Sequence, residues 1–140
     1  MEIRQQNRPA LFDLDNEKVS PLYSSVTQVP GRINSRGEEI EPLDLEIAEF
    51  ELKRILDRGI TSLAISLMHA TINPQHEREL GKLAESLGFE YVSLSHQVSP
   101  VAKYIGRTET AVLDAYISPY LFQYTRELEK ALGIKDIYYM

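Results

Sequence analysis

Few side chains in this sequence are of the types that most often carry chemistry. His69, His76 and His96 are its three histidines. His69 and His76 are seven residues apart across an expected strand-to-helix loop, unlike the i, i+4 helical pair that aims two imidazoles at one metal ion. We therefore expect no metal site. We expect His76 to interact with the first turn of its own helix. His69 should follow a parallel strand at its carboxyl end, where α/β proteins place ligands, so it is a candidate for ligand contact. The alternative is a loop histidine with a structural partner.

Other catalytic arrangements are missing from the sequence. Four serines lie in expected strands without a Gly-x-Ser-x-Gly turn around any of them: Ser62, Ser66, Ser93 and Ser95. The acidic residues are spread over helix faces, and no pair stands out as an acid/base couple. There is no cysteine, which excludes a thiolate nucleophile and a disulfide framework, and no glycine-rich phosphate loop. These residue types alone therefore do not indicate a function.

The helices and strands that would position these side chains can be predicted from turn-forming residues and from the spacing of apolar residues. Prolines and glycines are frequent in residues 1–42, where we predict an irregular segment and a β-hairpin, with strands in 24–33 and 38–40. After Pro42, apolar residues recur every three or four positions and predict a helix that Asp44 caps and Gly59 ends.

A parallel crossover is predicted for residues 43–98. Residues 62–68 are a short apolar run, typical of a strand buried on both faces. Asn73 and Pro74 begin a second helix that Gly88 ends, and residues 91–95 form the next strand. A strand, helix, strand order of this length predicts two parallel strands in one sheet. The fold class is therefore α/β, with a partly parallel sheet, flanking helices and the N-terminal hairpin.

Residues 99–140 are predicted to hold a long kinked helix and the start of a further strand, all within one domain or fragment. Ser99 and Pro100 predict a short helix ended by Gly106, and a longer helix should follow over 108–132, kinked or split by Pro119. Residues 137–139 should add a third parallel strand. Aromatic residues are frequent in this region, so we expect the chain to self-associate or to expose an apolar surface.

Bulk composition excludes several classes of protein. A chain of 140 residues with 43% hydrophobic and 26% charged residues is typical of one globular domain. Its formal net charge of -6 has the wrong sign for a protein that binds phosphates, so we expect no nucleic-acid partner. No apolar stretch approaches the length of a membrane span and no leader pattern opens the chain, so we expect a cytoplasmic protein.

Five segments, in this order, resemble the amino-terminal part of the hydantoinase A/5-oxoprolinase family. They are EIRQQNRPALFDL, GRINSRGEEIEPLD, LAISLMHATINPQHE, GFEYVSLSHQVSP and GRTETAVLDAYISPYLFQYTRELEKAL. The resemblance implies part of an actin-like ATPase fold, shared with sugar kinases and Hsp70. It also implies ATP-driven opening of cyclic amides, or a related carboxylation.

The resemblance also indicates what this chain lacks. In the family, one glycine-rich phosphate loop precedes the motif at Gln6, and later glycine-rich segments follow the strand that begins near Asp136. Neither lies within these 140 residues. We therefore expect a fragment that is not catalytic alone and holds no cofactor, with ATP and Mg implied for the full-length enzyme. Its expected partner is the rest of its own enzyme chain, a hydantoinase B-like subunit or a second copy. The alternative is a non-catalytic binding or interaction module derived from the same fold.

Candidate substrate contacts follow from the matching motifs. Asn7 and Arg8 offer donors suited to amide and carboxylate oxygens, although Arg8 could instead pin an irregular segment through a carboxylate. The segment from Arg107 to Thr110 resembles the family's Arg-Thr-Ser/Thr-Thr, in which hydroxyls cap the long helix and the arginine reaches toward the cleft. At Asp114 the family often has Asn. The candidate set is Asn7, Arg8, His69, Arg107, Thr108 and Thr110.

Overall fold

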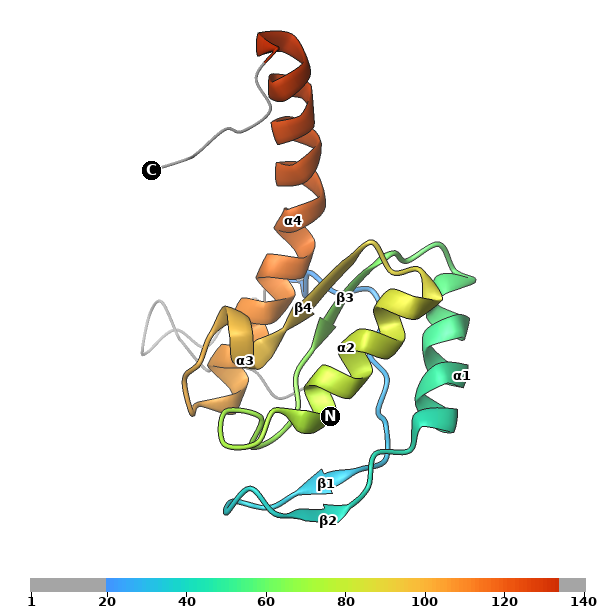
Figure 1. Ribbon diagram of the computed structural model, residues 1–140, viewed down its shortest axis with the longest axis vertical. Coiled ribbons are helices and arrows are strands. Elements are labelled where there is room, and N and C mark those ends of the chain that lie inside the picture. The colour runs from blue at the N-terminus through green and yellow to red at the C-terminus, as the bar shows by residue number, and fades with distance from the viewer. Residues whose placement is uncertain (1–19, 134–140) are drawn as a thin grey trace, which may run out of the picture.

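The computed structural model describes residues 20–133 (Figure 1). In chain order its elements are β1 (Arg32–Ile33), β2 (Glu39–Glu41), α1 (Leu45–Leu56), β3 (Ser62–Ile65), α2 (Gln75–Leu87), β4 (Tyr91–Leu94), α3 (Ser95–Val98) and α4 (Tyr104–Leu132). The predicted α/β class, with a hairpin, a two-stranded parallel sheet and flanking helices, is confirmed for this part of the chain. The predicted strand at residues 137–139 lies outside the described residues.

The N-terminal hairpin is shorter than predicted. β1 and β2 pair antiparallel, and the side chain of Asn34 closes the turn by accepting hydrogen bonds from the backbone N–H groups of Arg36 (2.8 Å) and Glu38 (3.0 Å). The predicted first strand began at residue 24, but only two of its residues join the ladder. Pro30 has no N–H to donate, which limits pairing toward the N-terminus; its carbonyl accepts from the Asp44 N–H (3.0 Å).

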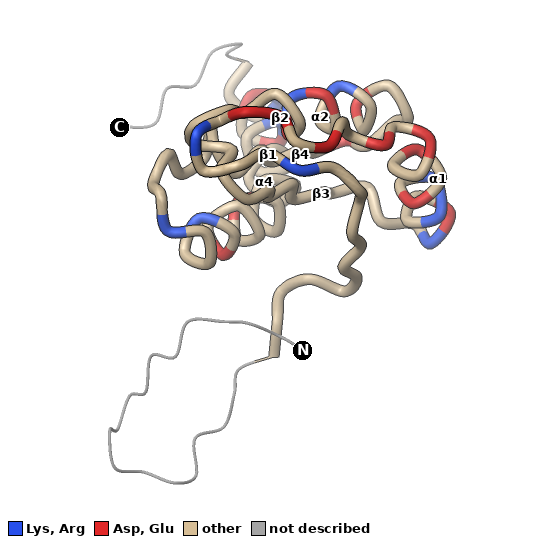
Figure 2. Tube along the Cα trace, turned by 90° about the horizontal axis from the view of Figure 1, so that it is seen from below, with Lys and Arg blue, Asp and Glu red and all other residues tan. Residues whose placement is uncertain are grey.

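Helix α1 forms as its cap and its apolar spacing predict. Asp44 Oδ1 accepts from the Ile47 N–H at 2.9 Å, which satisfies one of the free donors of the first turn. The buried face carries Ala48, Leu52 and Ile55. Acidic residues in the first part of the helix are followed by basic residues near its end (Figure 2), with ion pairs between Glu49 and Lys53 and between Glu51 and Arg54.

The parallel pair β3–β4 is the centre of a three-layer arrangement. Its register runs from Ser62 opposite Tyr91 to Ile65 opposite Leu94, which confirms the predicted parallel pairing. Ile65 packs with Ala48 of α1 and Leu80 of α2 on one face. On the other face Ser62 donates to a carbonyl of α4. Successive residues of a strand point to opposite faces, so helices cover both faces of β3, although only Ile65 of its four residues is fully buried.

Helix α2 begins one residue later than predicted. Asn73 Oδ1 accepts from the Gln75 N–H (3.0 Å), so the asparagine caps the helix across Pro74. Gly88 ends it in the left-handed conformation (φ 104°), which a residue without a side chain adopts at little cost.

The predicted helix between Ser99 and Gly106 is wrong. A short helix, α3, instead follows β4 directly, and α4 begins at Tyr104 after the extended backbone of Lys103. Gly106 therefore lies in the first turn of α4 and does not end a helix. A single glycine costs a helix only about 1 kcal/mol, which the packing of α4 on the sheet can offset.

Pro119 does not split α4, which runs continuously from Tyr104 to Leu132. A proline inside a helix lacks the N–H that would bond the carbonyl four residues earlier, here that of Ala115. The Ser62 hydroxyl of β3 donates to this same carbonyl. The acceptor that Pro119 leaves free is thus satisfied by the sheet. Within residues 20–133, no helix is both long enough and apolar enough to cross a membrane.

Candidate functional site

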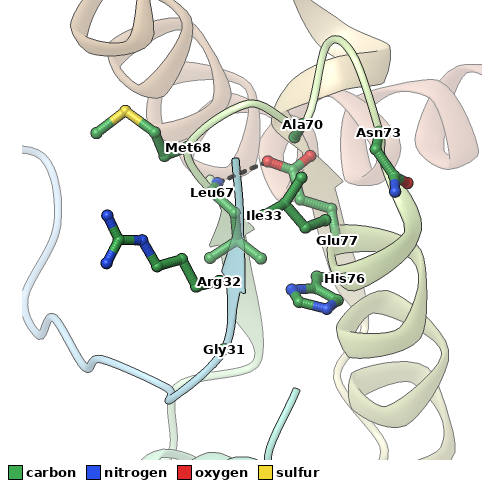
Figure 3. Close-up of a pocket in the computed structure, with 9 residues that line it drawn as sticks. All are labelled: Gly31, Arg32, Ile33, Leu67, Met68, Ala70, Asn73, His76 and Glu77. Atoms are coloured by element: carbon green, nitrogen blue, oxygen red, sulfur yellow. Dashed lines mark hydrogen bonds between the residues drawn. The ribbon is translucent and has the colours of Figure 1, made fainter. Parts of the chain in front are cut away.

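A buried carboxylate joins the carboxyl ends of the two parallel strands. Glu77, in the first turn of α2, is fully buried. Its Oε1 accepts from the Leu67 N–H, just after β3 (2.7 Å), and from the Ser95 hydroxyl, just after β4 (2.6 Å). Its Oε2 accepts from the backbone N–H (3.1 Å) and from Nδ1 (2.7 Å) of His96. Figure 3 shows the bond to Leu67.

The hydrogen bond to Glu77 also fixes the tautomer of His96. A carboxylate only accepts, so Nδ1 of His96 carries the proton. Nε2 of the same ring is buried and has no hydrogen-bond partner within the described part of the chain.

Arg107 forms the other half of this polar cluster. Its side chain is 1% exposed, and its guanidinium donates to the Ser95 hydroxyl (2.9 Å) and to the carbonyls of Leu67 (2.7 Å) and Val101 (3.2 Å). The Ser95 hydroxyl accepts from Arg107 and donates to Glu77, so it bridges the two buried charges. Hydrogen bonding of this kind is what makes burial of opposite charges tolerable.

The cluster holds the start of the loop that carries His69. Leu67 is bound through its N–H by Glu77 and through its carbonyl by Arg107. Just before it, Ser66 donates to Thr108 Oγ1 (2.6 Å), whose own proton goes to the Tyr104 carbonyl (2.8 Å). Three of the candidate residues thus meet at this loop: His69 lies in it, and Arg107 and Thr108 of α4 contact its first residues.

His69 itself has an unusual backbone conformation. Its φ is +64°, in the left-handed region that is uncommon for residues other than glycine, and its carbonyl accepts from the N–H groups of Ile72 (2.9 Å) and Asn73 (3.1 Å). Its side chain is half-buried. Strain of this kind persists only where the surrounding structure fixes the backbone, and it is frequent at functional sites.

The other candidates are not part of this cluster. Thr110 is exposed, donates to the Gly106 carbonyl (2.9 Å), and lines an open hollow of about 420 Å³ with Lys103 and Leu113. Asn7 and Arg8 lie outside the described residues. At Asp114, the carboxylate accepts a hydrogen bond from the Ser93 hydroxyl of β4, so the acid has its own partner.

A small cavity of about 90 Å³ lies between β1 and the His69 loop (Figure 3). His76 in its wall bonds Glu39 of the hairpin through Nε2 (2.6 Å), so its partner is the hairpin and not the first turn of its own helix. Asn73 donates to the Gly37 carbonyl (2.9 Å). The cavity has room for about three water molecules, well below the size of ordinary ligand pockets. The cavity is therefore too small to be a substrate pocket. The hydrogen bonds of His76 and Asn73 in its wall hold the hairpin against the start of α2.

The described residues do not fit ATP and magnesium. No group of three or more His, Asp or Glu side chains among residues 20–133 is arranged to hold a metal ion. The glycines at positive φ in that range stand singly at turns and helix ends and not in one loop: Gly31, Gly37, Gly59, Gly88 and Gly133. A nucleotide triphosphate needs several convergent backbone donors, which these isolated positions do not supply.

The sequence analysis did not predict that Glu77, Ser95 and His96 form a buried cluster. The reason is that it assigned all acidic residues, Glu77 among them, to solvated helix faces. A usable signal was present. Glu77 lies at helical spacing with the apolar Leu80 and Ala84, all of them buried. A charge on the apolar stripe of a helix predicts a buried charge with partners. Arg107 stands in the same relation to two buried alanines of α4, Ala111 and Ala115.

Comparison with known proteins agrees with the motif resemblance. Residues 1–88 match the family described as hydantoinase/oxoprolinase N-terminal region. The chain is 33% identical over 163 residues to 5-oxoprolinase 1 of Arabidopsis thaliana, which covers all of this chain and 13% of that protein. It is 38% identical over 93 residues to the acetophenone carboxylase gamma subunit of Aromatoleum aromaticum, covering 61% of this chain and 13% of the subunit.

A solved structure supports the fold. The ATP-dependent caprolactamase of Pseudomonas jessenii superposes with a TM-score of 0.72 at 24% identity, over 89% of this chain and 20% of that one. This chain therefore spans about one-eighth to one-fifth of the length of these proteins. On the family match and the ordered motifs together, the chain belongs to the hydantoinase/oxoprolinase family and corresponds to its N-terminal region.

Proposed function

We propose that this chain is a structural and substrate-contacting part of an ATP-dependent enzyme that opens cyclic amides, and that it is not catalytic alone. The observation that carries the proposal is the His69 loop, which starts between a buried carboxylate and a buried guanidinium at the carboxyl ends of β3 and β4. Open α/β sheets bind ligands at this edge. Relatives with the same region include 5-oxoprolinases, whose name describes a cyclic-amide substrate.

Within this proposal the candidate residues divide into two groups. His69, Asn7, Arg8 and Thr110 contact the substrate through polar groups suited to amide and carboxylate oxygens. Arg107 and Thr108 position the loop that carries His69, since their side chains hold Leu67 and Ser66 at its start.

The remaining parts of the enzyme would come from outside this unit. We propose that ATP and Mg are bound by glycine-rich segments of the rest of an actin-like ATPase fold, in the same polypeptide or an associated subunit, in the cytoplasm. Three findings support this division: the poor fit of residues 20–133 to a nucleotide, the small share of each relative that the chain covers, and a relative that is itself named as a subunit.

A chimera tests the proposal. The matching fifth of the caprolactamase would be replaced by this chain, and ATP hydrolysis would be measured with and without a lactam or 5-oxoproline. We expect hydrolysis that depends on the cyclic amide, and a loss of about tenfold or more with His69→Ala at an unchanged melting temperature. Glu85→Gln, an exposed site on α2, is the control. A folded chimera whose hydrolysis ignores the cyclic amide, or a His69→Ala variant as active as the control, would contradict the proposal.

A further inference from the structure

Within residues 20–133, the second half of α4 has no core to pack against. In Figure 1 the helix extends well beyond the sheet and the other helices. Its buried residues, Arg107, Ala111 and Ala115, all lie in the first half, where α4 covers β3 and β4. From Tyr116 to the end of the described helix, no side chain is buried.

The exposed part of α4 nevertheless has a continuous apolar face. At about 100° per residue, seven exposed apolar side chains fall within an arc of about 160°. They are Leu113, Tyr116, Ile117, Tyr120, Leu121, Tyr124 and Leu132, and we call this set the α4 face. Two charged residues, Asp114 and Glu127, lie at or near the edges of the arc.

Polar and charged side chains occupy the other side of the helix. Arg126, Glu129 and Lys130 are among them, and Phe122 on that side packs on Tyr91 of β4 with ring centroids 5.5 Å apart. The α4 face is therefore a one-sided apolar surface. Its residues remain largely in water, for example Tyr120 at 64% and Leu121 at 58% exposure.

A surface of this kind indicates a binding partner. Burial of apolar area is worth about 25 cal/mol per Å², and continuous exposed apolar patches beyond a few hundred Å² usually mark interaction sites. Tyrosines recur at every fourth position on the face, at Tyr116, Tyr120 and Tyr124. Tyrosine suits an interface because the ring is buried while the hydroxyl reaches a polar group.

We propose that the α4 face docks against the part of the family enzyme that lies outside this unit, in a concave apolar surface with hydrogen-bond acceptors at its rim. This inference rests on the proposed function. The chain spans 13% of its Arabidopsis relative and 20% of the caprolactamase, so those proteins contain a large additional polypeptide. The breadth of the face also favours such a partner over a second copy. Pairing of two α4 helices would cover only a narrow seam of two positions in seven.

Two variants with the same change in charge separate the α4 face from the rest of the helix. Tyr120→Glu combined with Tyr124→Glu alters the face, whereas Arg126→Glu alters the opposite side; each changes the net charge by about two units at neutral pH. In the isolated chain we expect a monomer by sedimentation for all three proteins. The double variant should bind less of an apolar dye and melt at the same temperature as wild type, because its two side chains are not buried there.

The same variants in the caprolactamase chimera test the partner. There we expect the double variant to lower the melting temperature by about 5 °C or more, or to abolish soluble assembly, with Arg126→Glu close to wild type. The proposal would be overturned if the two variants of the chimera had equal melting temperatures, or if the wild-type chimera gave no soluble protein. So would an isolated-chain dimer that only the double variant dissociates, since the partner would then be a second copy. A stable chimera without lactam-dependent hydrolysis would refute the proposed function and leave this inference standing.

Discussion

Replacing Glu77 should destabilise the chain more than any change of an exposed acidic residue. The carboxylate accepts four hydrogen bonds, from Leu67, from Ser95 and twice from His96. Glu77→Gln keeps the shape of the side chain and can keep the two bonds at Oε1. Its NH₂ group, however, takes the place of Oε2 and faces two donors of His96.

The size of this effect follows from what His96 can do. Its ring could move the proton to Nε2 and accept from the new amide at Nδ1. Within residues 20–133, however, Nε2 is buried without a partner, and the His96 backbone N–H still loses its acceptor. Each such loss costs about 1–3 kcal/mol, so we expect about 2–3 kcal/mol for Glu77→Gln. Glu77→Ala also leaves the Arg107 charge uncompensated, and it should cost about 3–5 kcal/mol.

Urea unfolding followed by far-UV circular dichroism measures these values. The control is Glu85→Gln, on the exposed side of the same helix, which should change the free energy of unfolding by less than about 0.5 kcal/mol. If Glu77→Gln unfolds at the same urea concentration as Glu85→Gln, the carboxylate does not hold the strand ends together, and the account of the His69 loop fails with it.

Three further outcomes are expected. His69→Gly should leave thermal stability unchanged or raise it, and His69→Val should lower it by about 1–2 kcal/mol, because a φ of +64° suits glycine and disfavours a β-branched residue. Gly31→Ala should cost about 2 kcal/mol or more in urea unfolding, because its Cβ would lie 3.1 Å from the Leu43 Cα, whereas Gly59→Ala, with open space around it, should cost about 1 kcal/mol. Calorimetry of the isolated chain with Mg-ATP should give no heat of binding, and micromolar affinity would contradict the view that the nucleotide is held elsewhere.

Local sequence rules predicted the elements whose ends are fixed by their own side chains. Asp44 caps α1 as expected, and Gly88 ends α2 in the left-handed conformation. The parallel pairing of β3 and β4 followed from the order and length of the segments. In each of these cases the decisive contacts lie within a few residues of each other, or follow from a general rule of chain connection.

The same rules failed where a distant residue decides the structure. A proline inside a helix can split it, but α4 continues through Pro119, and Ser62, 53 residues upstream of Ala115, satisfies the carbonyl that the proline leaves free. Glu77 was likewise assigned to solvent, because its partners lie elsewhere in the chain, at Leu67 after β3 and at Ser95 and His96 in α3. A pattern within one helix cannot show partners that only the fold brings near.

Helix α4 shows the limit of periodicity most clearly. The spacing of apolar residues over 108–132, with Tyr116, Tyr120 and Tyr124 among them, predicts a long helix, and the structure confirms it. Periodicity reports that a face exists and not what covers it, so the same spacing would suit a helix buried in its own domain. The structure distinguishes the two cases, because the buried residues of α4 end at Ala115 and lie on a different side of the helix from the α4 face, whose residues stay exposed as far as Leu132. The apolar pattern of α4 thus serves this unit's own core on one side and its contact surface on the other.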